Sequence, residues 1–176
     1  MINVILKSFF LILFIFNYSY SDTINSIKIN GNKRISKETI LILGDINIGS
    51  EFDSSNLNRS LKKLYDTKFF KDVELSFKNN SLVINLIENP IIEKINITGI
   101  KKKSFMEIIY DEISLKDRMS YTDFQFKKDV NLIQNILKIN GYYFSKIKIT
   151  KEENKEFNSI ILNIDIDLGD KAKIKD

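Results

Sequence analysis

The chain contains the same short pattern twice, about seventy residues apart, and this repetition limits the possible folds more than any other feature. Ile27-Lys-Ile-Asn-Gly31 in the first half matches Ile95-Asn-Ile-Thr-Gly99 in the second half, at an offset of 68 residues. Later, Tyr65-Asp-Thr-Lys-Phe-Phe-Lys-Asp-Val73 matches Ile139-Asn-Gly-Tyr-Tyr-Phe-Ser-Lys-Ile147 if the second copy carries a short insertion. Two tandem copies of one small unit indicate a modular interaction array rather than a single enzyme core.

The first 21 residues have the organisation of a secretory signal peptide. Lys7 precedes an apolar run from Phe9 to Phe16, and Ser19-Tyr-Ser21 supplies the small residues that a signal peptidase recognises. An uncleaved anchor is the alternative, but the run is shorter than the ~20 apolar residues of a membrane span. We therefore expect residues 1–21 to be a signal peptide that is cleaved after Ser21, with export of the remainder.

The composition excludes most catalytic chemistry. The sequence has no histidine, cysteine or tryptophan, so it lacks the commonest general base, the thiol nucleophile and the soft metal ligands. Its six glycines form no phosphate-binding or dinucleotide-binding motif. Asp165, Asp167 and Asp170 lack the spacing of a calcium loop. We expect no catalytic residue, no cofactor, no bound metal and no small-molecule substrate.

The formal net charge of +4 does not predict binding to nucleic acid. Basic residues are spread along the chain, where lysine alternates with isoleucine and asparagine, instead of gathering into one patch. We expect no nucleic-acid partner.

Each copy reads as strand, helix, helix, strand, strand. In the first copy Ser36 is expected to open a short helix that Gly44 stops, and a second helix starts at Asp53 or Ser54. A turn at Asn79-Asn80 then joins two strands with a period of two. The residues expected on the core side of this hairpin are Val73, Leu75, Phe77, Leu82, Ile84 and Leu86.

The second copy repeats this scheme. Ser104-Phe-Met-Glu107 and Thr122-Asp-Phe-Gln125 both have the capping-box pattern that marks a helix start. Asn140-Gly141 is typical of a left-handed helix stop. The following strand is expected to turn Ile147 and Ile149 inward, and the last strand alternates cleanly from Ile160 to Leu168.

The simplest closed arrangement of each unit is a three-stranded mixed sheet with both helices on one face, which is an α+β fold. The last strand should lie in the centre, between the opening strand and the first hairpin strand. The other face of the sheet and at least one edge then stay open.

The order of these motifs resembles the polypeptide-transport-associated (POTRA) domains of the BamA/Omp85 family of outer-membrane protein assembly factors. The resemblance rests on Ile27 to Ile35, on Leu64 to Val73, and most specifically on the junction Glu88-Asn-Pro-Ile-Ile92. It implies β-α-α-β-β domains at residues 22–90 and 91–169, and the start of a third POTRA domain or a linker at 170–176.

Lys68 departs from the family pattern. Glycine usually precedes the aromatic pair there, as Gly141 does in the second copy. If the backbone needs a positive φ at this residue, Lys68 carries about 1 kcal/mol of strain; otherwise the turn is reshaped.

The resemblance implies a non-enzymatic periplasmic scaffold of the outer-membrane β-barrel assembly machinery. Its expected partners are unfolded outer-membrane protein precursors, accessory assembly lipoproteins and periplasmic chaperones. The family reaches the membrane through a C-terminal barrel, which this sequence does not contain. Two alternatives remain: a POTRA module of two-partner secretion or autotransporter assembly, and a division-type POTRA protein anchored by residues 2–16.

An open sheet edge can accept an extended client as an added strand, so the first hairpin strand of each copy is the candidate binding edge. The candidate residues are Phe70, Val73, Leu75 and Phe77 in the first copy and Phe144, Lys146, Ile147, Lys148 and Ile149 in the second. Purely structural roles are the alternative, and Lys146 and Lys148 are equally consistent with protection of an edge against aggregation.

The three residues between the copies are the candidate interdomain hinge: Glu88, Asn89 and Pro90. Pro90 lacks a backbone donor and restricts the conformation of Asn89, which predicts a short, stiff joint rather than a flexible tether.

Overall fold

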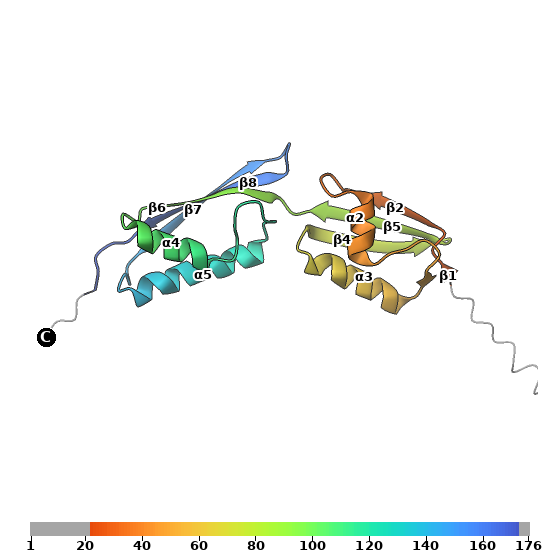
Figure 1. Cartoon of the computed structure of the whole chain (residues 1–176), viewed down its shortest axis with the longest axis horizontal. Coiled ribbons are helices and arrows are strands. Elements are labelled where there is room, and N and C mark those ends of the chain that lie inside the picture. Colours follow the sequence, from red (N-terminus) through yellow and green to blue (C-terminus); the bar gives the residue numbers. More distant parts are fainter. Residues whose placement is uncertain (1–21, 173–176) are drawn as a thin grey trace, which may run out of the picture.

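A computed structural model describes residues 22–172; the expected signal peptide at 1–21 and the segment 173–176 lie outside the described residues. The two repeats lie end to end, and in each of them a sheet is covered by helices on one side (Figure 1). None of the helices between residues 22 and 172 combines the length and apolar character needed to cross a membrane.

The first repeat has one three-stranded sheet, one two-stranded sheet and two helices. Its elements are β1 (Asp22–Thr23), β2 (Ser26–Asn30), α2 (Lys37–Gly44), β3 (Glu51–Phe52), α3 (Ser54–Asp66), β4 (Phe70–Lys78) and β5 (Ser81–Glu88). The main sheet has the order β2-β5-β4, with β5 parallel to β2 and antiparallel to β4. The return strand is central, as predicted.

The second repeat has the same architecture. Its elements are β6 (Ile91–Thr98), α4 (Lys103–Glu112), α5 (Asp123–Ile139), β7 (Lys146–Asn154) and β8 (Ser159–Asp167). Its sheet has the order β6-β8-β7, and again the central strand runs parallel to the opening strand and antiparallel to the hairpin strand. The predicted α+β fold with mixed sheets is confirmed.

Each repeat buries its own apolar core between the sheet and the helices, and the period-two pattern predicted which strand residues face it. In the first repeat Leu82, Ile84 and Leu86 of β5 are buried together with Leu64 of α3. The second core is formed in the same way, with Ile160, Leu162, Ile164 and Ile166 of β8 packed against Phe126, Ile133 and Leu137 of α5.

The two repeated opening motifs both end in glycine, and the same structural reason requires glycine at each of these positions. Gly31 and Gly99 both have a φ of +88°, in the left-handed region. A Cβ atom on Gly31 would lie 1.9 Å from the carbonyl oxygen of Leu86, and one on Gly99 would lie 1.9 Å from that of Ile166. Only glycine lets the opening strand end this close to the central strand.

The helix starts agree with the sequence in three of four cases, one of which is the cap of α2 at Ser36. Asp53 caps α3 by accepting a hydrogen bond from the Asn56 amide at 2.6 Å. Thr122 caps α5 by accepting one from the Gln125 amide at 3.2 Å, but the Gln125 side chain turns toward Asp129, so only half of the box forms.

The capping box expected at Ser104 is wrong. The cap is Lys102, two residues before Ser104, and it makes no side-chain bond, so that helix α4 begins at Lys103. The amides of Phe105 and Met106 both donate to the carbonyl of Lys102. This places Ser104 inside the first turn, where its hydroxyl has no cap position to occupy.

The end of α2 also differs from the expectation. Gly44 is the last helical residue, and Asp45 takes the left-handed position with a φ of 54°. A Cβ atom on Gly44 would lie 2.8 Å from Ile46 Cδ1, so a larger residue there requires the end of the Ile46 side chain to move. The two-residue pairing of β1 with β3 was not predicted, because it is too short to show a period.

Lys68 does adopt the strained conformation. Its φ is 60°, while Gly141 takes the equivalent position in the second repeat with a φ of 90°. We expect Lys68→Gly to raise the free energy of unfolding by up to about 1 kcal/mol, measured by urea denaturation. Lys78→Gly, in extended β4, is the control and should lower it by a similar amount. Destabilisation by Lys68→Gly would contradict the prediction.

Candidate functional site: the free strand edges and the joint between the repeats

Strand β4 forms one edge of the first sheet, and Tyr65 of α3 occupies part of that edge. The Tyr65 hydroxyl lies 3.0 Å from the amide nitrogen of Val73 and 3.4 Å from its carbonyl oxygen. It also lies 3.1 Å from Asp72 Oδ1. Both backbone groups of Val73 therefore point away from β5, and an incoming strand has to displace Tyr65 before it can pair there.

Strand β7 has no such cap. Ile147 lies opposite Ile166 as Val73 lies opposite Leu86, so the two residues hold equivalent places in their sheets. Because backbone groups alternate along an antiparallel strand, those of Ile147 and Ile149 point to the free edge. In the part of the chain that the structure describes, no hydrogen bond from outside the β7–β8 ladder reaches either residue.

The candidate edge residues are not all placed as predicted. Strand β7 begins at Lys146 and so excludes the candidate Phe144, because a turn closed by the Ser145 amide on the Tyr142 carbonyl precedes it. Phe144 therefore lies in this turn, with 78% of its surface exposed, and not on the edge strand. Phe70 does lie on β4, but its side chain is buried.

The other candidate residues lie on the predicted strands. Lys146 and Lys148 are exposed, whereas Ile147 and Ile149 are half-buried against the second core. Val73 is buried, and Leu75 and Phe77 are half-buried against the first core.

The far half of β7 is tied to α5 by a polar cluster. Lys151 Nζ lies 3.0 Å from Asp123 Oδ1 and also contacts the Tyr121 hydroxyl. Burial of the phenol raises the pKa of Tyr121, while hydrogen bonds from Tyr121 and then Lys151 lower the pKa of Asp123. Burial acts to lower the pKa of Lys151, but its bonds to Tyr121 and Asp123 outweigh this and raise it. Lys151 and Asp123 are thus a stable ion pair at neutral pH.

The sheet faces opposite the helices are polar and internally hydrogen-bonded. On the first sheet Asn30 donates to Asn85 at 2.8 Å, and Asn85 donates to Glu74 at 3.3 Å. The second sheet carries a similar chain, in which Asn96 donates to Asn163 at 2.8 Å and Asn163 donates to Glu152 at 2.6 Å. The main apolar residue exposed on these faces is Ile87 of β5, with 56% of its surface accessible.

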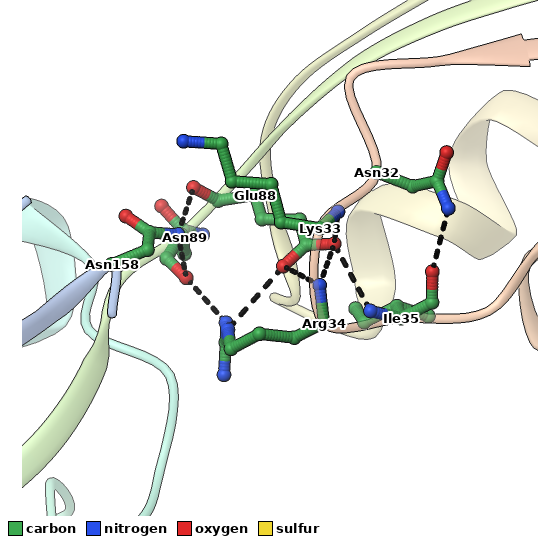
Figure 2. Close-up of polar contacts among 7 residues, drawn as sticks. All are labelled: Asn32, Lys33, Arg34, Ile35, Glu88, Asn89 and Asn158. Carbon is green, nitrogen blue, oxygen red and sulfur yellow. Dashed lines mark hydrogen bonds and ion pairs between the residues drawn. The ribbon is translucent and has the colours of Figure 1, made fainter. Parts of the chain in front are cut away.

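The joint between the repeats is organised around Glu88, the last residue of β5 (Figure 2). Its carboxylate accepts hydrogen bonds from the amides of Lys33 at 2.7 Å, Arg34 at 3.0 Å and Ile35 at 3.1 Å. Arg34 Nε forms an ion pair with it at 3.3 Å, and only 1% of the Glu88 side chain is exposed. One carboxylate therefore holds the loop that follows β2.

Asn89 is bonded from both repeats. On the first side its amide donates to the Phe69 carbonyl and its side chain donates to the Lys68 carbonyl, both at 2.8 Å. Its own carbonyl accepts from Arg34 at 2.8 Å and from Asn158 of the second repeat at 3.4 Å (Figure 2). These contacts restrain the joint beyond what Pro90 does alone.

Comparison with known proteins agrees with this architecture. The sequence profile of the POTRA family, described as a surface antigen variable number repeat, matches residues 23–89 and 90–169. The chain belongs to the POTRA family.

The curated relatives of these POTRA repeats are outer membrane protein assembly factors named BamA. The chain is 33% identical over 90 residues to BamA of Neorickettsia risticii, covering 51% of this chain and 12% of that protein. It is 27% identical over 161 residues to BamA of Neisseria meningitidis serogroup B, covering 88% of this chain and 19% of that protein. The chain thus spans less than a quarter of either relative.

A solved structure supports the POTRA fold. The N-terminal domain of Omp85 from Thermosynechococcus elongatus superposes with a TM-score of 0.51 at 12% sequence identity, covering 84% of this chain and 63% of that one.

Sequence reasoning missed two features of these POTRA repeats. It gave Tyr65 no role at a sheet edge, although 40% of Tyr65 is exposed and its hydroxyl reaches β4. It also missed the bonds of Glu88 to the loop that follows β2. A comparison of the two copies of the motif could have found Tyr65. The second copy has Lys138 or Ile139 at the equivalent position, and neither side chain has a hydroxyl that could bind the strand edge.

Proposed function

We propose that this chain is the POTRA array of a periplasmic, non-enzymatic scaffold for outer-membrane protein assembly. It binds unfolded outer-membrane protein precursors by strand addition and also receives accessory assembly proteins. The names of its relatives support the assembly role. The observation that carries the binding mechanism is the uncapped backbone of Ile147 and Ile149 on β7.

The proposal that the chain is a periplasmic POTRA array also gives an organisation for the whole chain. Residues 1–21 are a cleaved signal peptide that directs the protein to the periplasm. Residues 22–90 and 91–169 are the two POTRA domains, and 170–176 lead into a further domain or a linker. Glu88, Asn89 and Pro90 act as the joint that sets the angle of the array.

Strand addition suits a scaffold that has many clients, because main-chain groups supply the bonds and no particular client sequence is required. Ile147 and Ile149 together offer two amides and two carbonyls. Each bond contributes about 0.5–1.5 kcal/mol net, so binding is weak and readily reversed. A client can then be passed on to the next step of assembly.

The edge is a better client site than the open face of the sheet. The side chains on that face already satisfy one another, as in the pair Asn96 and Asn163. A client lying on the face has to break these bonds, and burying a polar group without a partner costs free energy. A client added to β7 breaks none.

The test is a backbone amide NMR titration of residues 22–176 with unfolded peptides derived from outer-membrane β-barrels. We expect the largest shifts from Lys146 to Thr150 on β7 and smaller ones on β4. Shifts on the open faces instead, or no shifts at millimolar peptide, would contradict strand addition.

Tyr65→Phe should open the edge of β4. The substitution removes the hydroxyl that competes for Val73 but keeps the ring, so the affinity of this edge should rise about fivefold, the equivalent of one hydrogen bond. The readout is the concentration dependence of the Val73 amide shift in the same titration. Tyr143→Phe is the control, because the Tyr143 hydroxyl makes no hydrogen bond among the described residues. An unchanged Val73 response in Tyr65→Phe would show that the hydroxyl does not guard this edge.

A further inference from the structure

A groove with a volume of about 460 Å³ lies at the joint and is walled by both repeats. The first repeat contributes Arg34, Lys68 and Phe69 from the loops that Glu88 and Asn89 hold. The second contributes Arg118 and Met119 from the segment between α4 and α5. This groove is separate from the free edges of β4 and β7.

The charges around the groove are all of one sign. Arg34, Lys68 and Arg118 line it, and no carboxylate does. Arg34 is paired with Glu88. Lys68 and Arg118 form no ion pair with any residue from 22 to 172, and their side chains make no hydrogen bond there. The groove therefore presents two uncompensated cations.

Both of these cations sit on a strained backbone. Lys68 has a φ of 60° and Arg118 a φ of 69°, where glycine is favoured. No contact of either side chain within the described fold offsets this strain. Backbone hydrogen bonds hold both turns, from the Lys68 amide to the Tyr65 carbonyl and from the Arg118 amide to the Ile92 carbonyl, but they do not require a cationic side chain. A lysine and an arginine at these two positions therefore point to a function, here the placement of positive charge at the groove.

The walls of the groove are held in place before any ligand binds. Glu88 fixes the wall of the first repeat through the amides of residues 33–35. Asp129, which is buried on α5, fixes the opposite wall by accepting hydrogen bonds from the amides of Ser114 at 3.0 Å and Leu115 at 2.8 Å. A preformed site loses less conformational entropy on binding.

The apolar part of the groove is accessible. Phe69 keeps 39% and Met119 keeps 46% of its surface exposed, one on each side of the joint. An aromatic or aliphatic side chain that bridges them buries apolar surface from both repeats.

We propose that this groove binds a short segment of a partner protein in which a carboxylate side chain lies next to an aromatic or aliphatic one. The carboxylate meets Lys68 and Arg118, and the apolar side chain meets Phe69 and Met119. The groove recognises the side chains of its ligand, whereas the β7 edge pairs with the main chain of its ligand. The occupant of the groove is therefore a dedicated partner with a defined sequence and not an unfolded client. The net charge of +4 disfavours a second copy of this chain.

The test is fluorescence anisotropy of the purified chain with a labelled, capped pentapeptide that carries two carboxylates flanking one phenylalanine. A second peptide has the corresponding amides in place of the carboxylates. We expect the acidic peptide to bind about tenfold more tightly, as two charge-assisted contacts require. Binding of the acidic peptide should shift the backbone amide resonances of the protein most strongly at Phe69 and Met119.

Lys68→Gly and Arg118→Gly are informative variants because each removes a charge and also relieves backbone strain, so neither is expected to unfold the chain. Each should weaken binding of the acidic peptide about fivefold. Lys155→Gln removes the same charge in the turn between β7 and β8 and should leave binding unchanged.

Three results would overturn the proposal. Equal affinity for the acidic and amide peptides would exclude recognition of the carboxylate. Displacement of the acidic peptide by an unfolded barrel peptide would assign the groove to clients. Self-association of the chain that Arg118→Gly abolishes would assign it to a second copy.

Discussion

Replacement of Gly99 by alanine is expected to unfold the second POTRA repeat. The new Cβ atom would lie 1.9 Å from the carbonyl oxygen of Ile166 in the central strand, and the φ of +88° is itself unfavourable for alanine. Relief requires that β6 move away from β8, which breaks the parallel pairing of the sheet. We expect a loss of more than about 4 kcal/mol, close to the whole stability of so small a repeat.

Gly49→Ala separates the two causes of this loss. Gly49 has a φ of +85°, but a Cβ atom there would meet nothing within 4 Å. It should therefore cost only the backbone strain of about 1–2 kcal/mol. Urea denaturation gives the free energies, and amide NMR spectra show which repeat unfolds. A loss in Gly99→Ala no larger than in Gly49→Ala would contradict the close approach of the two strands.

Glu88→Gln is expected to loosen the joint and to destabilise the first repeat by about 3 kcal/mol. The wild-type carboxylate satisfies the amides of residues 33–35 and also pairs with Arg34. A glutamine can keep its single acceptor oxygen on the three amides, all of which bond to Oε1 in the wild type. Its NH₂ group then replaces Oε2 and faces the Arg34 guanidinium, so the ion pair is lost and two donors oppose each other. Because Arg34 is 31% exposed, water screens part of the lost ion pair.

Glu74→Gln is the matched control, because Glu74 accepts a single bond from Asn85 on the exposed sheet face. It should change the free energy of unfolding by less than about 0.5 kcal/mol. Residual dipolar couplings measured on both variants report the angle between the repeats. We expect this angle to become variable only in Glu88→Gln. Equal stability losses in the two variants would show that the joint does not depend on the carboxylate.

Local patterns predicted the repeat unit well. The alternation from Ile160 to Ile166 identified the central strand of the second repeat, and Asp53 and Thr122 marked two helix starts. The departure at Lys68 from the glycine of the second copy correctly drew attention to a positive φ. All of these signals act between residues that are close in the sequence.

The errors arose where a local pattern competed with an alternative of similar energy. Ser104 has the pattern of a helix cap, but the cap of α4 lies two residues earlier, at Lys102, which leaves Ser104 inside the first turn. The aromatic residues Tyr143 and Phe144 favour an earlier strand start, but a turn at Tyr142 to Ser145 delays β7 to Lys146. When the start of a helix or strand moves by one to three residues, few local interactions change. The sequence pattern therefore does not distinguish the predicted start from the observed one.

The sequence by itself determined the two repeats, their order of elements and the family to which they belong, because periodicity, capping and turn residues act locally. Only the tertiary structure decided which sheet edge is free and how the joint is built. Glu88 bonds residues more than 50 positions away in the chain, and Tyr65 reaches across from α3 to β4. Such bonds form only when the packing of helices and strands brings together residues that are far apart in the sequence. A local sequence pattern does not show which of these residues will meet in space.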